Sequence, residues 1–243
     1  MRLAPSCLLL ALAATPGLAL AQEAGDDGVW SVEGGVTGVS DFVWRGVTQT
    51  DGDPALQGEV TVSHASGFYA GAWASTVDFG DPDDGIDHEI DLYAGWAGEL
   101  GEGTELDLSV TRVRYPGVNE GYELDYTEFA AALSFADYYT VGVAYSPDIF
   151  QLGDKGIYYS AAAEYPLGDS GLGLKLSTGW YDLDDAAGDS YGDWLVGLTR
   201  SFGPIDAELH YTDTVSYGEA LAENLDDADK ADGRLALQLT WGF

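Results

Sequence analysis

The chain has 243 residues, with 42 Asp and Glu against 9 Lys and Arg, and a formal net charge of −33 at pH 7. A surface this acidic repels phosphate groups, which excludes nucleic acid as a partner. A hydrophobic content of 46% is too high for a disordered acidic tail, and a single Cys excludes a disulfide framework and a thiolate metal cluster. What remains to be accounted for is the combination of extreme acidity with 7 Trp and 15 Tyr.

The first 21 residues have the features of a secretory signal peptide. A positive start is followed by the apolar residues 8–14 and by the small-residue cleavage pattern Ala19-Leu20-Ala21. The apolar stretch is too short for a transmembrane anchor. We therefore expect a signal peptide over residues 1–21 and a single exported domain over residues 22–243.

Beyond the signal peptide, apolar and polar residues alternate with a period of two, which is typical of half-buried β-strands. Each run is about ten residues long, the length that a tilted strand needs to cross a bilayer. The run at 122–135 is ambiguous because acids fall on both of its faces, which a β-bulge would reconcile. The twelve runs lie near residues 29–40, 55–64, 68–79, 88–100, 104–115, 122–135, 138–146, 157–166, 172–182, 191–202, 205–213 and 233–243.

The connections between these runs alternate between short and long. Short turns joined to long loops are typical of outer-membrane barrels, with tight turns in the periplasm and extended loops outside. The sequence therefore predicts an all-β fold, a transmembrane antiparallel β-barrel of about 12 strands with both termini in the periplasm. The long connections are residues 41–54, 80–87, 116–121, 147–156, 183–190 and 214–232.

Alternation alone does not say which face points outward, since a lipocalin-like barrel would bury its apolar face. Acids on the polar face of most strands favour a water-filled lumen, with the apolar face against lipid. A ring of acids inside such a lumen selects cations. The residues predicted to line the pore are Glu59, Glu89, Asp91, Glu105, Asp107, Glu164, Lys175, Asp193, Asp206 and Glu208.

Aromatic residues near the ends of the apolar faces also favour a lipid-facing exterior. Amphipathic rings at the level of the lipid headgroups form two girdles around outer-membrane barrels. The residues expected in these girdles are Trp30, Tyr69, Trp73, Trp96, Tyr139, Tyr145, Tyr165, Trp180, Trp194 and Trp241.

Two further features indicate partners in the bacterial outer membrane. The ending Leu-x-Leu-x-Trp-x-Phe, with Phe243 last, resembles the C-terminal signal by which the barrel-assembly machinery recognises its substrates. Arg112 and Arg114 fall on the apolar face near the external end, where they could bind lipopolysaccharide phosphates or snorkel to the rim. Outer-membrane lipid, lipopolysaccharide and the assembly machinery are therefore the expected partners, together with small solutes.

Several segments resemble a known family. They are Asp41–Gly46, Pro54–Gly58, Ser66–Gly71, Glu89–Gly95 and Tyr115–Gly117. In these segments the chain resembles the TorF porin family, proteobacterial outer-membrane proteins of largely uncharacterised function. The resemblance implies a transmembrane barrel and a channel, and it supplies no catalytic residues.

The long connections hold much of the acid. One interpretation is an electrostatic funnel that concentrates cations at the external mouth. The alternatives are Ca²⁺ held between loops, at residues 81–85 and 226–229, and a solvated acidic surface. No EF-hand spacing is present, and no cofactor is expected apart from such Ca²⁺. The residues predicted at the mouth are Arg45, Asp51, Asp53, Asp83, Asp84, Asp226 and Asp227.

An enzymatic function is not indicated. His210 shares the polar face with Asp206 and Glu208, but no nucleophile elbow or histidine motif accompanies it, so a lumen-lining histidine is favoured. Two hypotheses follow. The first is a porin-like channel for passive diffusion of small, preferentially cationic or neutral solutes. The second is a closed structural or receptor barrel whose acidic loops bind Ca²⁺ or a partner.

Overall fold

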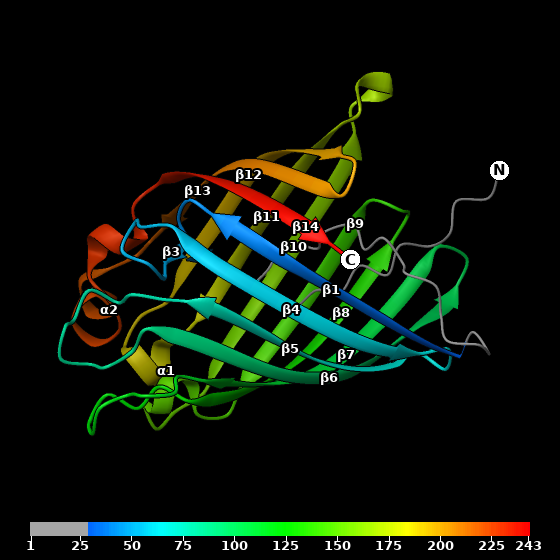
Figure 1. Ribbon diagram of the computed structural model, residues 1–243. Helices are drawn as coiled ribbons and strands as arrows, with labels where there is room; N and C mark the ends of the chain where they lie inside the picture. Colours follow the sequence, from blue (N-terminus) through cyan, green and yellow to red (C-terminus); the bar gives the residue numbers. More distant parts are fainter. Residues whose placement is uncertain (1–28) are drawn as a thin grey trace.

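The computed structural model describes residues 29–243, so the expected signal peptide lies outside the described residues. Twelve antiparallel strands close into a barrel (Figure 1). The expectation of a 12-stranded barrel is confirmed, and most strand ends fall within two residues of the alternating runs. The strands are β1 Trp30–Val39, β4 Ala55–His64, β5 Phe68–Thr76, β6 His88–Gly101, β7 Thr104–Arg114, β8 Tyr126–Phe135, β9 Tyr139–Ser146, β10 Gly156–Pro166, β11 Leu172–Asp182, β12 Tyr191–Phe202, β13 Ile205–Val215 and β14 Arg234–Gly242.

The last strand closes the barrel against the first. In order around the wall, β1 lies between β4 and β14, and every other strand pairs with its neighbours in the chain. Gly34 and Phe243 exchange backbone hydrogen bonds of 2.9 Å in both directions, so the terminal residue takes part in the seam. Closure leaves no open sheet edge, which is what a β-structure needs in order to cross a bilayer.

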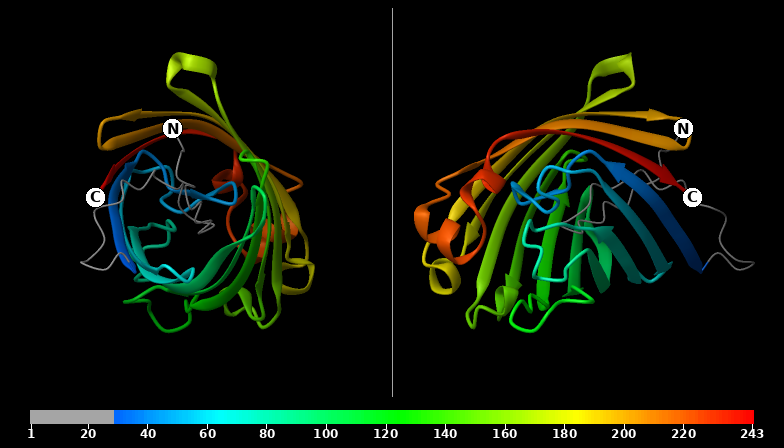
Figure 2. Two further views of the ribbon diagram at one scale, coloured as in Figure 1. Left: turned by 90° about the vertical axis from the view of Figure 1, so that its right-hand side faces the viewer. Right: turned by 60° about the vertical axis from the view of Figure 1, so that its left-hand side comes forward.

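Short turns lie at one end of the barrel and long loops at the other (Figures 1 and 2). The long loops at the opposite end from the start of β1 contain all the remaining elements except one. These are strands β2 Val43–Trp44 and β3 Val47–Thr48, helices α1 Asp184–Ala187 and α2 Glu219–Asn224, and the 3-10 turns η1 Ile149–Gln151 and η3 Ala228–Ala231. The exception, η2 Gly168–Ser170, lies in the short turn between β10 and β11. We call the loop end external, because long loops face outward in outer-membrane barrels.

The exterior of the wall is apolar. Leu92 is 50% exposed, Leu237 44% and Trp30 56%, whereas the polar residues beside them on the same strands face inward. Side chains of this kind belong against hydrocarbon, because a continuous apolar band of this extent is not tolerated on a surface in water. No helix within residues 29–243 is long and apolar enough to span a bilayer.

Two details of the sequence interpretation are wrong. The run at 122–135 has no bulge: β8 begins only at Tyr126 and pairs with β7 in continuous register, so the conflicting acids Glu123 and Asp125 belong to the loop. The register shift lies instead between Glu99 and Gly101 of β6. Alternation could not locate the strand start, because polar loop residues happen to continue the period of the strand.

One periplasmic turn makes a strong demand on its sequence. Gly67, between β4 and β5, has φ +91°, and a Cβ there would lie 2.1 Å from the carbonyl oxygen of Ala97. We expect Gly67→Val to lower the free energy of unfolding by more than about 4 kcal/mol and to prevent assembly of the barrel. Heat-modifiable electrophoretic migration measures the folded fraction. Gly38→Val is the matched control, because nothing lies within 4 Å of a Cβ there, and normal folding of Gly67→Val would contradict the prediction.

The candidate pore and its inner hairpin

The ten residues predicted to line the pore all lie on the inner face of the barrel. Nine of them are carboxylates, yet each of the ten is buried or half-buried. Their apolar neighbours along the strands, such as Leu92, Leu108 and Leu209, are exposed instead. This inverted pattern places the charged groups inside the barrel. The acids come from β4, β6, β7, β10, β12 and β13, so they surround the lumen rather than gather on one wall.

Several of these groups are paired. The hydroxyl of Tyr69 donates to both oxygens of Asp107 at 2.8 and 2.9 Å. Lys175 donates to Glu208 at 3.0 Å, and Nδ1 of His210 lies 2.9 Å from the same carboxylate. Lys175 therefore pairs with one acid of the inner wall, and His210 lies beside the same carboxylate on the inner face.

The first long loop folds into the barrel. We call its residues 41–50, which include β2 and β3, the inner hairpin. All of them are buried or half-buried, and the view along the barrel shows this segment within the ring of strands (Figure 2). Thr214 of β13 and Asp193 of β12 would lie within 3 Å of a Cβ at Gly46, so the hairpin tip rests against the inner wall at these two strands.

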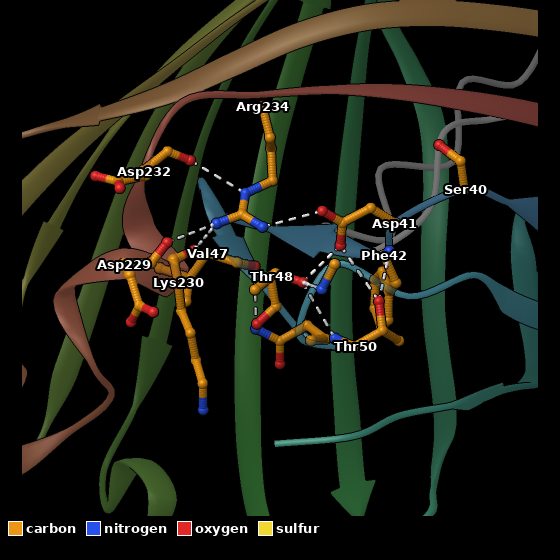
Figure 3. A network of polar contacts seen from close by, with 12 residues as sticks. Ser40, Asp41, Phe42, Val47, Thr48, Thr50, Asp229, Lys230, Asp232 and Arg234 are labelled. Carbon is orange, nitrogen blue, oxygen red and sulfur yellow. Dashed lines mark hydrogen bonds and ion pairs between the residues drawn. The ribbon is translucent and has the colours of Figure 1, made fainter. Parts of the chain in front are cut away.

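A buried polar network fixes the base of the inner hairpin. Asp41 accepts hydrogen bonds from the hydroxyl groups of Thr48 at 2.5 Å and Thr50 at 3.2 Å. It also forms an ion pair of 3.0 Å with Arg234. Arg234 also donates to backbone carbonyls of the last external loop, among them that of Lys230 (Figure 3). The first and last external loops are thus joined through one guanidinium.

The tip of the hairpin carries a buried arginine. Arg45 was predicted at the external mouth, but its side chain is 1% exposed inside the barrel, because Nη2 lies 2.8 and 2.7 Å from the two carboxylate oxygens of Glu128. Burial is the largest single effect and opposes the charged form, but Glu128 and the surrounding tyrosines together outweigh it and raise the pKa of Arg45 above its ordinary value. The chain fixes a permanent cation inside a lumen whose wall is rich in carboxylates.

Aromatic side chains pack around this hairpin from the wall and from other loops. Phe42 contacts Trp73 of β5 at a ring separation of 5.4 Å, and Trp44 contacts Phe150 of η1 and Tyr181 of β11 at 6.0 and 5.8 Å. The inner hairpin therefore belongs to one packed cluster of buried side chains at the external end of the barrel. Its largest fully buried members include Tyr181, Tyr191, Ile149, Leu183 and Leu221.

This cluster corrects the expectation that the aromatic residues face lipid. Tyr69 and Trp73 were assigned to the girdles, but both point into the barrel, where Tyr69 binds Asp107 and Trp73 packs on the hairpin. Ring character alone does not distinguish a girdle from a lumen filled by aromatic side chains. Members of the predicted girdles that are exposed on the outside are Trp30, Tyr139, Tyr145, Trp180 and Trp241.

The other predicted mouth residues differ in exposure. Asp51, Asp53, Asp83 and Asp227 are exposed on the external loops. Asp84 is buried, because it accepts the backbone N–H of Ile86 at 2.6 Å and so fixes a turn.

Asp226 is half-buried and forms an ion pair of 2.6 Å with Lys230. Burial raises the pKa of Asp226 above its ordinary value although Lys230 lies beside it. Within residues 29–243, no group of three or more His, Cys, Asp or Glu side chains is arranged to hold a metal ion.

Arg112 and Arg114 lie on the outer face, as their parity indicated. Their side chains are 46% and 58% exposed, and both reach Asp125 of the following loop, at 3.3 and 3.4 Å. The carboxylate occupies part of their hydrogen-bonding capacity and holds the two guanidinium groups at the external rim.

Sequence reasoning missed Glu128 as a lumen residue. Its strand appeared ambiguous, but with the start at Tyr126 the alternation is clear: Phe129 and Phe135 are exposed, while Glu128, Ala132 and Ser134 face inward. The signal was present in residues 126–135 and was obscured by the acids of the preceding loop.

The barrel has the fold of solved outer-membrane porins. It matches a KdgM porin, solved in complex with disordered oligogalacturonate, with a TM-score of 0.54 and 8% identity, over 87% of this chain and 99% of that one. It matches the chain in a structure reported under "Unveiling the Mechanism Behind the in-meso Crystallization of Membrane Proteins" with a TM-score of 0.51 and 14% identity, over 87% and 83%. NanC porin matches with a TM-score of 0.48 and 12% identity, over 88% and 97%.

The porin fold, the closed wall and the apolar exterior together place the protein in the bacterial outer membrane. The comparison with curated proteins found no match. A family model described as "Bacterial protein of unknown function (Gcw_chp)" matches residues 23–243, and the chain belongs to this family.

Proposed function

We propose that the protein is a channel for passive diffusion of small solutes that prefers cations, in keeping with its resemblance to the TorF porin family. The observation that carries the proposal is the charge of the inner wall. The nine predicted carboxylates, from six strands, and Glu128 of β8 face the lumen. Among the bases there, Lys175 and His210 both contact Glu208, and Arg45 is bound to Glu128. Acids that line water favour cations and repel anions. The acidic external loops extend the same field to the mouth.

Reversal potentials across a planar bilayer with a KCl gradient test this proposal. We expect the sign that indicates K⁺ preference in the wild type. The triple variant Glu59→Gln, Glu105→Gln, Glu164→Gln should lose about half or more of that preference, because these half-buried acids of the inner wall set the local potential. A lower salt concentration should strengthen the preference for K⁺, because fewer ions then screen the charges of the carboxylates.

A matched triple variant provides the control. Glu102→Gln, Glu120→Gln and Glu223→Gln remove the same charge from exposed turn and loop positions. The control should keep most of the wild-type preference. Anion preference in the wild type, or equal loss in both triple variants, would overturn the cation-channel proposal.

A second candidate is a closed barrel with a structural or receptor role, and the packed cluster at the external end of the barrel favours it. The inner hairpin and residues of η1, α1 and α2 form one cluster of buried apolar side chains at the external end. In this case the wild type would not conduct, and the acidic external loops would bind Ca²⁺ or a partner. Calorimetry with Ca²⁺, together with the absence of ion flux, would support this candidate.

A further inference from the structure

We propose that the pocket around Arg45 is a recognition site for guanidinium cations, and that Arg45 occupies it as a tethered ligand. The inference rests on the proposed function, because it names the class of cation that the lumen recognises. The site combines a buried carboxylate with the faces of aromatic rings, which is the chemistry that binds planar organic cations.

The pocket surrounds the guanidinium on several sides. The Cζ atom of Arg45 lies 4.1 Å from the ring centroid of Trp44, 4.2 Å from that of Tyr158 and 4.5 Å from that of Tyr181. Glu128 lies at 2.7 Å from Nη2. Trp44 belongs to the hairpin itself, whereas the two tyrosines and the glutamate belong to strands β10, β11 and β8. The wall therefore supplies two rings and one charge for whichever cation fills the site.

The tether prevents Arg45 from making its best contacts. A single nitrogen, Nη2, donates to both oxygens of Glu128, while Nε and Nη1 are buried without a hydrogen-bond partner. A guanidinium and a carboxylate prefer two parallel hydrogen bonds from two nitrogens. A free guanidinium compound can rotate into that arrangement, because no backbone restrains it.

The surroundings offer further acceptors for a cation. Asp91 is 7% exposed, its Oδ1 has no hydrogen-bond partner, and it lies within electrostatic reach of Glu128. Tyr181 has a buried hydroxyl without a partner, and the hydroxyl of Tyr158 donates to Asp193. The described wall thus offers oxygen atoms around the pocket beyond the two of Glu128 that Arg45 uses, and a small cation with several donors can bind them.

The backbone at Arg45 makes a clean test possible. Its φ of +48° lies in the left-handed region that favours glycine. Arg45→Gly therefore removes the tethered ligand and leaves the hairpin with a residue suited to its conformation. Arg45→Ala serves as a second variant in case the first fails to assemble, and heat-modifiable migration verifies the fold of each.

Isothermal titration calorimetry on the detergent-solubilised barrel measures the occupancy of the site directly. Methylguanidinium chloride is the probe, and tetramethylammonium chloride is the control cation without hydrogen-bond donors. We expect Arg45→Gly to bind methylguanidinium at least about tenfold more tightly than it binds tetramethylammonium. We expect the wild type to bind methylguanidinium at least about tenfold more weakly than Arg45→Gly does, because Arg45 competes for the site. Adding Glu128→Gln to Arg45→Gly should weaken methylguanidinium binding by about tenfold or more.

The outcomes separate this inference from the proposed function. Equal binding of both cations, equal binding by wild type and Arg45→Gly, or no effect of Glu128→Gln would overturn the guanidinium site, whatever the channel conducts. Cation-selective currents with no calorimetric signal in either Arg45 variant would overturn the site alone. Calorimetric binding without any ion flux would leave the site and remove the channel.

Discussion

Removal of the inner hairpin should raise the single-channel conductance by roughly a factor of three or more. Its buried residues and the aromatic rings packed on them form one cluster at the external end of the barrel, so the hairpin is the principal obstruction contributed by the first loop. The backbone N–H of Gln49 donates to the carbonyl of Phe42 at 2.7 Å, so these residues are already adjacent. Two glycines can therefore replace residues 43–48 without straining the wall. Planar-bilayer recordings at fixed KCl measure the change.

The control shortens another external loop. Residues 120–123 are exposed and lie between β7 and β8, and replacing them with two glycines removes loop mass without touching the lumen. This variant should conduct as the wild type does. An unchanged conductance after removal of the hairpin would contradict its role as the obstruction. The absence of current in every variant would instead favour the closed barrel.

The wall could be predicted from the sequence because its physical signal is local. Alternation with a period of two, interrupted by short turns, specifies both the strands and the face that each residue presents. Asp107 and Glu208, for example, lie on the inner face where parity put them. The strand boundaries failed where polar loop residues continued the period, as before Tyr126.

The interior of the barrel could not be predicted in the same way. Alternation says that a side chain faces the lumen, but not what meets it there. The pairing of Arg45 with Glu128 joins residues 83 positions apart, and the contact between Asp41 and Arg234 joins residues 193 apart. Such contacts depend on how the first loop folds into the closed barrel. Its composition resembles that of an exposed loop, and only its aromatic residues, such as Trp44, hinted at burial.

Replacing the partner of Arg45 should release the inner hairpin. Glu128→Gln leaves the guanidinium buried without its charge partner, which costs about 3–5 kcal/mol in comparable sites. A cost of that size favours states in which Arg45 reaches water by a factor between about a hundred and a few thousand. The rings of Tyr158 and Tyr181 remain, but their attraction for the cation is worth only about 0.5–2 kcal/mol each and does not compensate.

Limited proteolysis with trypsin measures this release, because trypsin cleaves after Arg45 only when the hairpin leaves the lumen. The side chain is 1% exposed in the wild type, so cleavage between Arg45 and Gly46 should be slow there and at least about tenfold faster in Glu128→Gln. N-terminal sequencing identifies the new end at Gly46, separately from any cleavage after Lys155, which is exposed.

The matched control is Glu120→Gln, which removes an exposed acid from the loop between β7 and β8. Its cleavage after Arg45 should equal that of the wild type. If Glu128→Gln is cleaved no faster than this control, the ion pair does not hold the hairpin in place. The anchor would then be the network of Asp41 and Arg234 at the hairpin base, and Arg234→Met should produce the cleavage that Glu128→Gln did not.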